Sequence, residues 1–234
     1  MKVIPNIFTL INAVFGCVAL YYIGDSQFVA ATFCILFAAF MDLLDGYFAR
    51  LLGATSELGA QLDSLADVIS FGVVPGALAM TLLSTLHLEL PWIFFGFVIT
   101  LGSVYRLAKY NISPENREYF TGLPTPANAL FWIGIPHLNL SISIMTLLFI
   151  VALSTFLLNS RIKFIKIGIK KSFLSLSFIA TLIIASLILG LRMGLGAISG
   201  VVVLYVVFST IQTRVLRPRS PTCRTAKIEK PIPL

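Results

Sequence analysis

Long apolar stretches separated by short polar segments occupy most of this chain. Eight of them predict helices, at residues 6–23, 28–48, 58–86, 91–109, 124–138, 141–159, 172–191 and 195–213. The stretch at 124–138 is short for a hydrocarbon core of about 30 Å, so this helix is expected to tilt, to re-enter the membrane, or to continue into the next helix through the weak break HLNLS. The pattern predicts an all-α fold, a polytopic transmembrane bundle of about eight helices.

The distribution of lysine and arginine gives this bundle an orientation. With a cytoplasmic N-terminus, all of the 17 basic residues except Arg192 fall on the cytoplasmic side, which is a strong positive-inside pattern. We therefore expect cytoplasmic N- and C-termini. Residues 1–213 are expected to form one transmembrane catalytic domain, with a core that carries the motifs at about 4–130. Residues 214–234 are expected to form a basic, disordered cytoplasmic tail.

The composition of the chain limits the kinds of binding partner that we expect. The chain is 58% hydrophobic and 12% charged, with a net charge of +7, and its basic residues lack a soluble fold that would present them to nucleic acid. A cytoplasmic basic collar instead suits the lipid bilayer and an anionic substrate, so we expect no nucleic-acid partner. The three cysteines lack metal-type spacing, and His87 and His137 are predicted at the outer ends of spans. The first apolar stretch lacks a clear cleavage site, which favours a mature helix over a signal peptide.

Four of the five aspartates lie in one short segment, DLLDGYFARLLGATSELGAQLDSLAD, at residues 42–67. Asp42 and Asp45 share a helix face, and Asp63 and Asp67 share a face of the next predicted helix. Four carboxylates at close range require cations or protons between them, and their oxygens are hard ligands. The segment therefore predicts a site for two divalent ions, Mg²⁺ or Mn²⁺, of the kind that supports phosphoryl transfer.

Small and basic residues accompany these carboxylates. Gly46 and Ala49 leave a helix backbone open to a phosphate or a ribose, and Arg50 offers a guanidinium that suits phosphate. Each element alone has a commoner explanation, such as helix packing or membrane anchoring, but acidic residues inside a membrane are costly and usually functional. A cation transporter is the alternative from another class. It is disfavoured because the cluster occurs once, near one surface, without a repeated half.

The spacing D-x2-D-G-x2-A-R-x8-G-x3-D-x3-D resembles the signature of the CDP-alcohol phosphotransferases. All eight fixed positions are filled, by Asp42, Asp45, Gly46, Ala49, Arg50, Gly59, Asp63 and Asp67. The resemblance implies that the four aspartates hold two divalent metals and that Asp67 is also the general base. It further implies that Gly46, Ala49, Arg50 and Gly59 lie along the CDP moiety of CDP-diacylglycerol. Membrane homodimers are general in this family.

A polar stripe of Asn6, Thr9 and Asn12 in the first helix could face the nucleotide or join helices by hydrogen bonds, and the sequence leaves both open. We count Asn6 and Thr9 among the candidate contacts of CDP-diacylglycerol. GLPTPAN predicts a turn into a helix, with Thr125 as its cap and Pro126 in its first turn.

Further segments narrow the resemblance to one branch of the family, the membrane-integral phosphatidylserine synthases. These segments are IPNIFTLIN, SLADVISFGVVPG, YRLAKYN and FTGLPTPANAL. The resemblance implies phosphatidyl transfer from CDP-diacylglycerol to L-serine, with release of CMP, at the cytoplasmic side of the cell (inner) membrane. Arg106 and Lys109 are candidates for binding serine, although Lys109 replaces an arginine found in many members. Glycerol phosphate or an inositol phosphate is the alternative acceptor.

Overall fold

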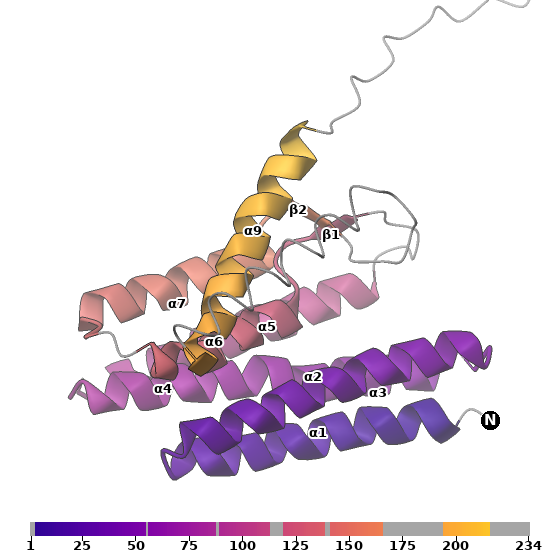
Figure 1. The fold of residues 1–234 in the computed structure, drawn as a ribbon, viewed down its shortest axis with the longest axis horizontal. Coiled ribbons are helices and arrows are strands. Elements are labelled where there is room, and N and C mark those ends of the chain that lie inside the picture. Colours follow the sequence, from indigo (N-terminus) through magenta and orange to yellow (C-terminus); the bar gives the residue numbers. More distant parts are fainter. Residues whose placement is uncertain are drawn as a thin grey trace, which may run out of the picture.

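Antiparallel helices dominate the computed structural model, which describes residues 3–54, 56–87, 89–112, 119–138, 141–165 and 194–215 (Figure 1). Helices α1 (Val3–Gly24) and α2 (Phe28–Leu51) form a hairpin. Helix α3 (Glu57–Asp67), the π-helical turn η1 (Val68–Val73) and α4 (Val74–Thr85) follow as one continuous helix of 29 residues.

The second half of the fold begins with η2 (Trp92–Phe97), which leads into α5 (Val98–Asn111). The chain continues through α6 (Thr125–Gly134), η3 (Ile135–His137) and α7 (Ile144–Asn159), and ends its described part in η4 (Gly194–Gly196) and α9 (Ala197–Val215). Two short strands, β1 (Tyr119–Thr121) and β2 (Lys163–Ile165), pair antiparallel between the helices.

The helical class predicted from the sequence is confirmed, and the pair of short strands was not predicted. Seven of the eight predicted helices correspond to described helices, while the stretch 172–191 lies outside the described residues. Four helices of the described part are long and apolar enough to cross a membrane: Ile4–Gly24, Phe28–Leu51, Glu57–Thr85 and Trp92–Asn111. The total of eight spans and the side of the termini stay predictions. Helices α6 and α7 are separate, because Ser143 caps α7 in an extended conformation.

Small residues bring the helices close together. A Cβ atom added at Gly16 in α1 would lie 2.9 Å from the Cα of Ser70 in η1. A Cβ atom added at Gly96 in η2 would likewise lie 2.5 Å from the backbone nitrogen of Met80 in α4. The close approach of α1 to η1 matters for function, because Asp67 immediately precedes η1.

The wide turn η1 interrupts the regular helix just before Pro75. Proline lacks an amide hydrogen and its ring clashes with the preceding turn, so a local π-helical turn accommodates it within a continuous helix. Buried apolar side chains, including Phe71, Leu78, Ile99 and Trp132, form the core around this segment.

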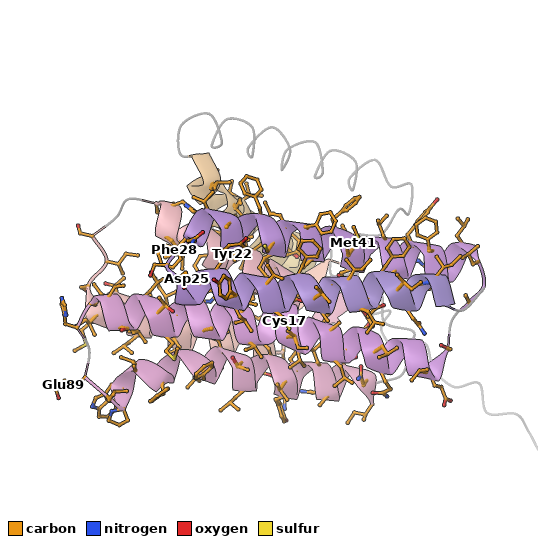
Figure 2. The ribbon with its side chains drawn as sticks, turned by 90° about the horizontal axis from the view of Figure 1, so that it is seen from below. Cys17, Tyr22, Asp25, Phe28, Met41 and Glu89 are labelled. Carbon is orange, nitrogen blue, oxygen red and sulfur yellow. The ribbon has the colours of Figure 1, made fainter. Side chains whose placement is uncertain are left out.

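Large apolar side chains also cover the outside of the bundle, where Phe33, Leu43, Phe149 and Phe156 are all exposed. Such a surface suits lipid rather than water. Figure 2 places Asp25 and Glu89 at the same end of the bundle, in the α1–α2 and α4–η2 turns. The aspartates of the 42–67 segment lie toward the opposite end, near the α2–α3 connection, so the acidic segment sits near one surface of the bundle.

Candidate active site

Three of the four predicted carboxylates converge between α2 and α3. Asp42, Asp63 and Asp67 each contribute one oxygen, and these oxygens all lie within 4.8 Å of one another. Asp67 is only 9% exposed, and Asp42 and Asp63 are half-buried. The Oδ1 atoms of Asp63 and Asp67 are buried without a hydrogen-bond partner. Because a buried carboxylate oxygen needs a donor or a cation, this group fits a divalent ion held by hard oxygen ligands.

Asp45 lies beside this group and has a different contact. Its side chain is 6% exposed, and its Oδ2 accepts a 2.7 Å hydrogen bond from the Thr9 hydroxyl of α1. The same hydroxyl lies 3.1 Å from the carbonyl oxygen of Pro5, so its one hydrogen is shared between the two acceptors. Thr9 therefore joins two helices and orients a carboxylate of the motif, while the role of Asp45 as a metal ligand stays a prediction.

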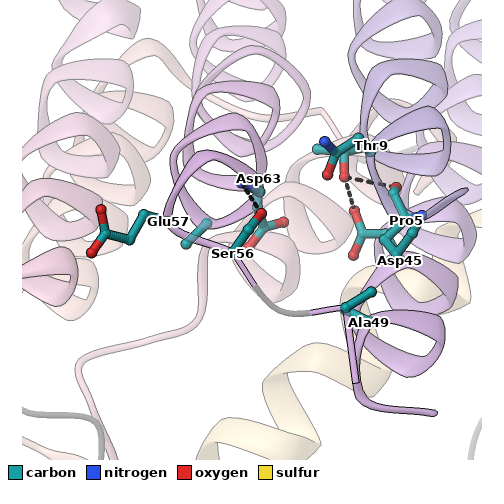
Figure 3. Close-up of a pocket in the computed structure, with 12 residues that line it drawn as sticks. Pro5, Thr9, Asp45, Ala49, Ser56, Glu57 and Asp63 are labelled. Atoms are coloured by element: carbon teal, nitrogen blue, oxygen red, sulfur yellow. Dashed lines mark hydrogen bonds between the residues drawn. The ribbon is translucent and has the colours of Figure 1, made fainter. Parts of the chain in front are cut away.

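A pocket of about 460 Å³ opens beside the carboxylates, between α1, α2 and the start of α3 (Figure 3). Five predicted contacts of CDP-diacylglycerol line it together with two aspartates: Asn6, Thr9, Asp45, Gly46, Ala49, Gly59 and Asp63. The N-terminus of α3 forms one edge, because Ser56 caps this helix by accepting a 3.0 Å hydrogen bond from the amide of Gly59. The pocket thus joins the small residues of the motif to its carboxylates.

The glycines of the motif leave space that side chains would fill. A Cβ atom at Gly59 would lie 3.3 Å from Oδ1 of Asn6, so α1 and α3 approach closely at the pocket. A Cβ atom at Gly46 would lie 3.8 Å from Nη2 of Arg50. Arg50 is exposed and does not itself line the pocket, but its guanidinium lies beside the open backbone of Gly46.

The two predicted serine contacts occupy different environments. Arg106 is 8% exposed, and its Nη1 donates a 3.3 Å hydrogen bond to the Thr125 hydroxyl at the start of α6. The charge of Asp67 acts on this guanidinium, so the two groups lie within electrostatic range of one another. Lys109, one turn later in α5, is exposed.

The prediction that Thr125 caps its helix was wrong. Pro124 occupies the cap position and makes no side-chain hydrogen bond, and Thr125 is the first residue of α6. The hydroxyl of Thr125 accepts from Arg106 instead. The GLPTPAN segment therefore starts α6 and also holds the buried guanidinium of Arg106.

The two histidines lie away from this site, in agreement with the sequence prediction. His137 makes a 2.9 Å contact between its Nε2 and the Thr32 hydroxyl near the start of α2. His87 occupies the turn after α4, at the end of the bundle that carries Asp25 and Glu89.

Buried polar residues on α6 and α7 were missed. Asn128 in α6 and Ser154 in α7 are buried and hydrogen-bonded to one another. The sequence did contain a sign of this contact, since Asn128 is an amide within an apolar helix. Polar side chains in apolar helices usually face a partner.

Apolar helices, a convergent carboxylate group and an adjoining pocket define a membrane protein with a candidate divalent-metal site. The sequence profile of the family described as CDP-alcohol phosphatidyltransferase matches residues 2–212, and the chain belongs to this family.

Three relatives illustrate the similarity. A CDP-diacylglycerol–serine O-phosphatidyltransferase of Mycobacterium leprae is 35% identical over 60% of this chain and 48% of its own. One of Bacillus subtilis is 32% identical over 54% of this chain and 71% of its own. An archaetidylserine synthase of Methanothermobacter thermautotrophicus is 33% identical over 54% of each chain. The chain spans about half the length of the mycobacterial and archaeal relatives.

Proposed function

We propose that the protein transfers a phosphatidyl group from CDP-diacylglycerol to the hydroxyl of L-serine, forming phosphatidylserine and CMP. The observation that carries this proposal is a pocket beside the three-carboxylate group, together with a buried arginine on which the charge of Asp67 acts. The names of the relatives support the same substrates.

The carboxylates support a metal-dependent reaction. Asp42, Asp63 and Asp67 would hold one divalent ion, and Asp45, held by Thr9, would contribute to a second. Magnesium or manganese fits best, because every ligand is a carboxylate oxygen. When bound, such ions neutralise a diphosphate and stabilise charge on a leaving oxygen.

The pocket between α1, α2 and α3 suits the CDP part of the donor. Gly46, Ala49 and Gly59 leave its walls open to the nucleotide and the diphosphate, and the exposed guanidinium of Arg50 lies near Gly46. The lipid chains would lie along the apolar outer surface of the bundle, in the bilayer. This division suits a substrate with a polar head and two hydrocarbon tails.

Asp67 and Arg106 would act on the acceptor. Arg106 binds the serine carboxylate, and Asp67 accepts the hydroxyl proton as the serine oxygen attacks the phosphorus that bears diacylglycerol. A phosphorus–oxygen bond to serine forms, the bond to the bridging oxygen breaks, and CMP leaves with that electron pair. Lys109, exposed on the next turn of α5, would attract the anionic substrates from outside the site.

A phosphorylated acceptor is the second candidate within the family. Glycerol phosphate or an inositol phosphate brings a dianion, which favours several cations at the acceptor side. Of the described cations near the carboxylates, only Arg106 is buried, and one guanidinium matches the single carboxylate of serine. We further propose that the enzyme works as a homodimer in the cell (inner) membrane, with its site at the cytoplasmic side, as the positive-inside pattern supports.

The test uses purified protein with CDP-diacylglycerol, Mn²⁺ or Mg²⁺ and isotopically labelled serine. We expect label in the lipid extract from the wild type and none from Asp67→Asn. An Arg106→Ala variant should raise the KM for serine far more than the KM for CDP-diacylglycerol. Equal labelling by the wild type and Asp67→Asn would show that Asp67 is not the base.

A further inference from the structure

Two buried hydrogen-bond donors without partners belong to residues joined at the N-terminal end of α6. They are Nε of Arg106 and Nδ2 of Asn128. Arg106 is 8% exposed and Asn128 is 1% exposed, so bulk water does not satisfy either atom. Unpaired buried donors are rare because each costs stability, so each one calls for an explanation, such as a partner that binds there.

The orientation of the Asn128 amide is set by its neighbours. The indole Nε1 of Trp132 donates a 3.0 Å hydrogen bond to the hydroxyl of Ser154, and this hydroxyl donates to Oδ1 of Asn128. With the amide oxygen engaged by Ser154, its NH₂ group is left as a donor. The free donor is therefore fixed by a chain of hydrogen bonds within the core.

Thr125 relates the positions of Arg106 and Asn128. It accepts a hydrogen bond from Arg106 and is the first residue of α6, and Asn128 follows one turn later on the same helix face. The start of a helix also presents backbone N–H groups and a partial positive charge. Arg106 in turn lies within the field of Asp67, the proposed base. An anion held by Arg106 would thus lie within electrostatic range of Asp67.

We propose that Nε of Arg106 and Nδ2 of Asn128 form a subsite for the carboxylate of the amino-acid acceptor, at the N-terminus of α6. Asn128 is then a specificity-determining residue, and Ser154 is a positioning residue that acts through its amide. A carboxylate offers two oxygens to these two donors. This inference rests on the proposed function, since it names how serine is held.

The experiment measures KM for serine and for CDP-diacylglycerol in Asn128→Ala and in a matched control, Asn159→Ala. Asn159 in α7 is also part-buried, but its NH₂ group donates to the carbonyls of Gly102 and Thr155, so it offers no donor to a ligand. We expect Asn128→Ala to raise the serine KM roughly tenfold, with the CDP-diacylglycerol KM within about twofold of the wild type. Asn159→Ala should leave the ratio of the two KM values unchanged.

Ser154→Ala tests the positioning role. It should raise the serine KM less than Asn128→Ala does, and the double variant should show no more than the Asn128→Ala effect, because both changes act on one donor. The inference is overturned if the serine KM rises no more than the CDP-diacylglycerol KM, or if Asn159→Ala gives the same selective rise. If the wild type uses serine, the proposed function stands whatever the variants show. If the wild type uses only other acceptors, the proposed function and this inference are both overturned.

Discussion

Replacing Thr9 by valine tests whether the contact between α1 and Asp45 supports the site. Valine keeps the branched shape of threonine and replaces the hydroxyl by a methyl group. The hydroxyl lies 2.7 Å from Oδ2 of Asp45 and 3.1 Å from the carbonyl oxygen of Pro5, and its single hydrogen is shared between these two acceptors. Thr9 and Asp45 are only 3% and 6% exposed, so their contact is largely screened from bulk water. A hydrogen bond to a charged group contributes about 1.5–3 kcal/mol, and the change leaves a carboxylate oxygen of the motif without its partner.

Thr81→Val is the matched control. Thr81 in α4 donates only to the carbonyl of Ala77 four residues earlier, at 3.0 Å, and so lacks the contact with a carboxylate. The difference between the two variants isolates the bond to Asp45. At about 2–4 °C per kcal/mol for a chain of this size, Thr9→Val should melt roughly 3–12 °C below Thr81→Val.

The assay combines thermal melting in detergent with CMP release over a titration of Mn²⁺ or Mg²⁺. A misplaced Asp45 should raise the divalent concentration that gives half-maximal activity by about tenfold, which corresponds to about 1.4 kcal/mol. The reasoning is refuted if Thr9→Val and Thr81→Val melt together and share one divalent dependence.

Three further predictions concern the chemistry, the packing and the topology. Asp67→Asn should lower kcat by at least about 100-fold with little change in the KM for CDP-diacylglycerol, since a base acts in the chemical step; steady-state kinetics checks this. Gly16→Ala should destabilise the protein by about 1–3 kcal/mol, because the new methyl group meets the Ser70 backbone. As a control, Gly24→Ala should be neutral or slightly stabilising, because no atom lies within 4 Å of the added methyl group. Coinciding melting curves for the two variants would contradict this prediction. In a chain without its native cysteines, an impermeant thiol reagent should label Glu57→Cys from the cytoplasm and Ser26→Cys from outside, and the reverse pattern would invert the proposed orientation.

The helices were predictable because membrane thickness sets the length of apolar stretches. Predicted ends such as 28–48 and 58–86 correspond to helices at Phe28–Leu51 and Glu57–Thr85. The convergence of Asp42, Asp63 and Asp67 was predictable for a similar reason, since helical periodicity places each pair of aspartates on one face.

Contacts between distant segments were not predictable in this way. The hydrogen bond from Arg106 to Thr125 depends on how α5 packs against α6. Local rules instead predicted that the Thr125 hydroxyl caps α6. The hydrogen bond to Asp45 comes from Thr9, 36 residues earlier in the chain. The β1–β2 pair also depends on tertiary packing, because no periodic pattern marks it.

The central claim is that this carboxylate site performs a metal-dependent transfer to serine. The most direct measurement is CMP release by the purified protein from CDP-diacylglycerol, with serine, glycerol 3-phosphate or inositol phosphate as acceptor, each with and without divalent ions. We expect CMP to appear with serine in the presence of Mn²⁺ or Mg²⁺, in equal amount to phosphatidylserine, and to be absent when the ions are chelated. Release with glycerol 3-phosphate or inositol phosphate but not with serine, or undiminished release after chelation, would contradict the account.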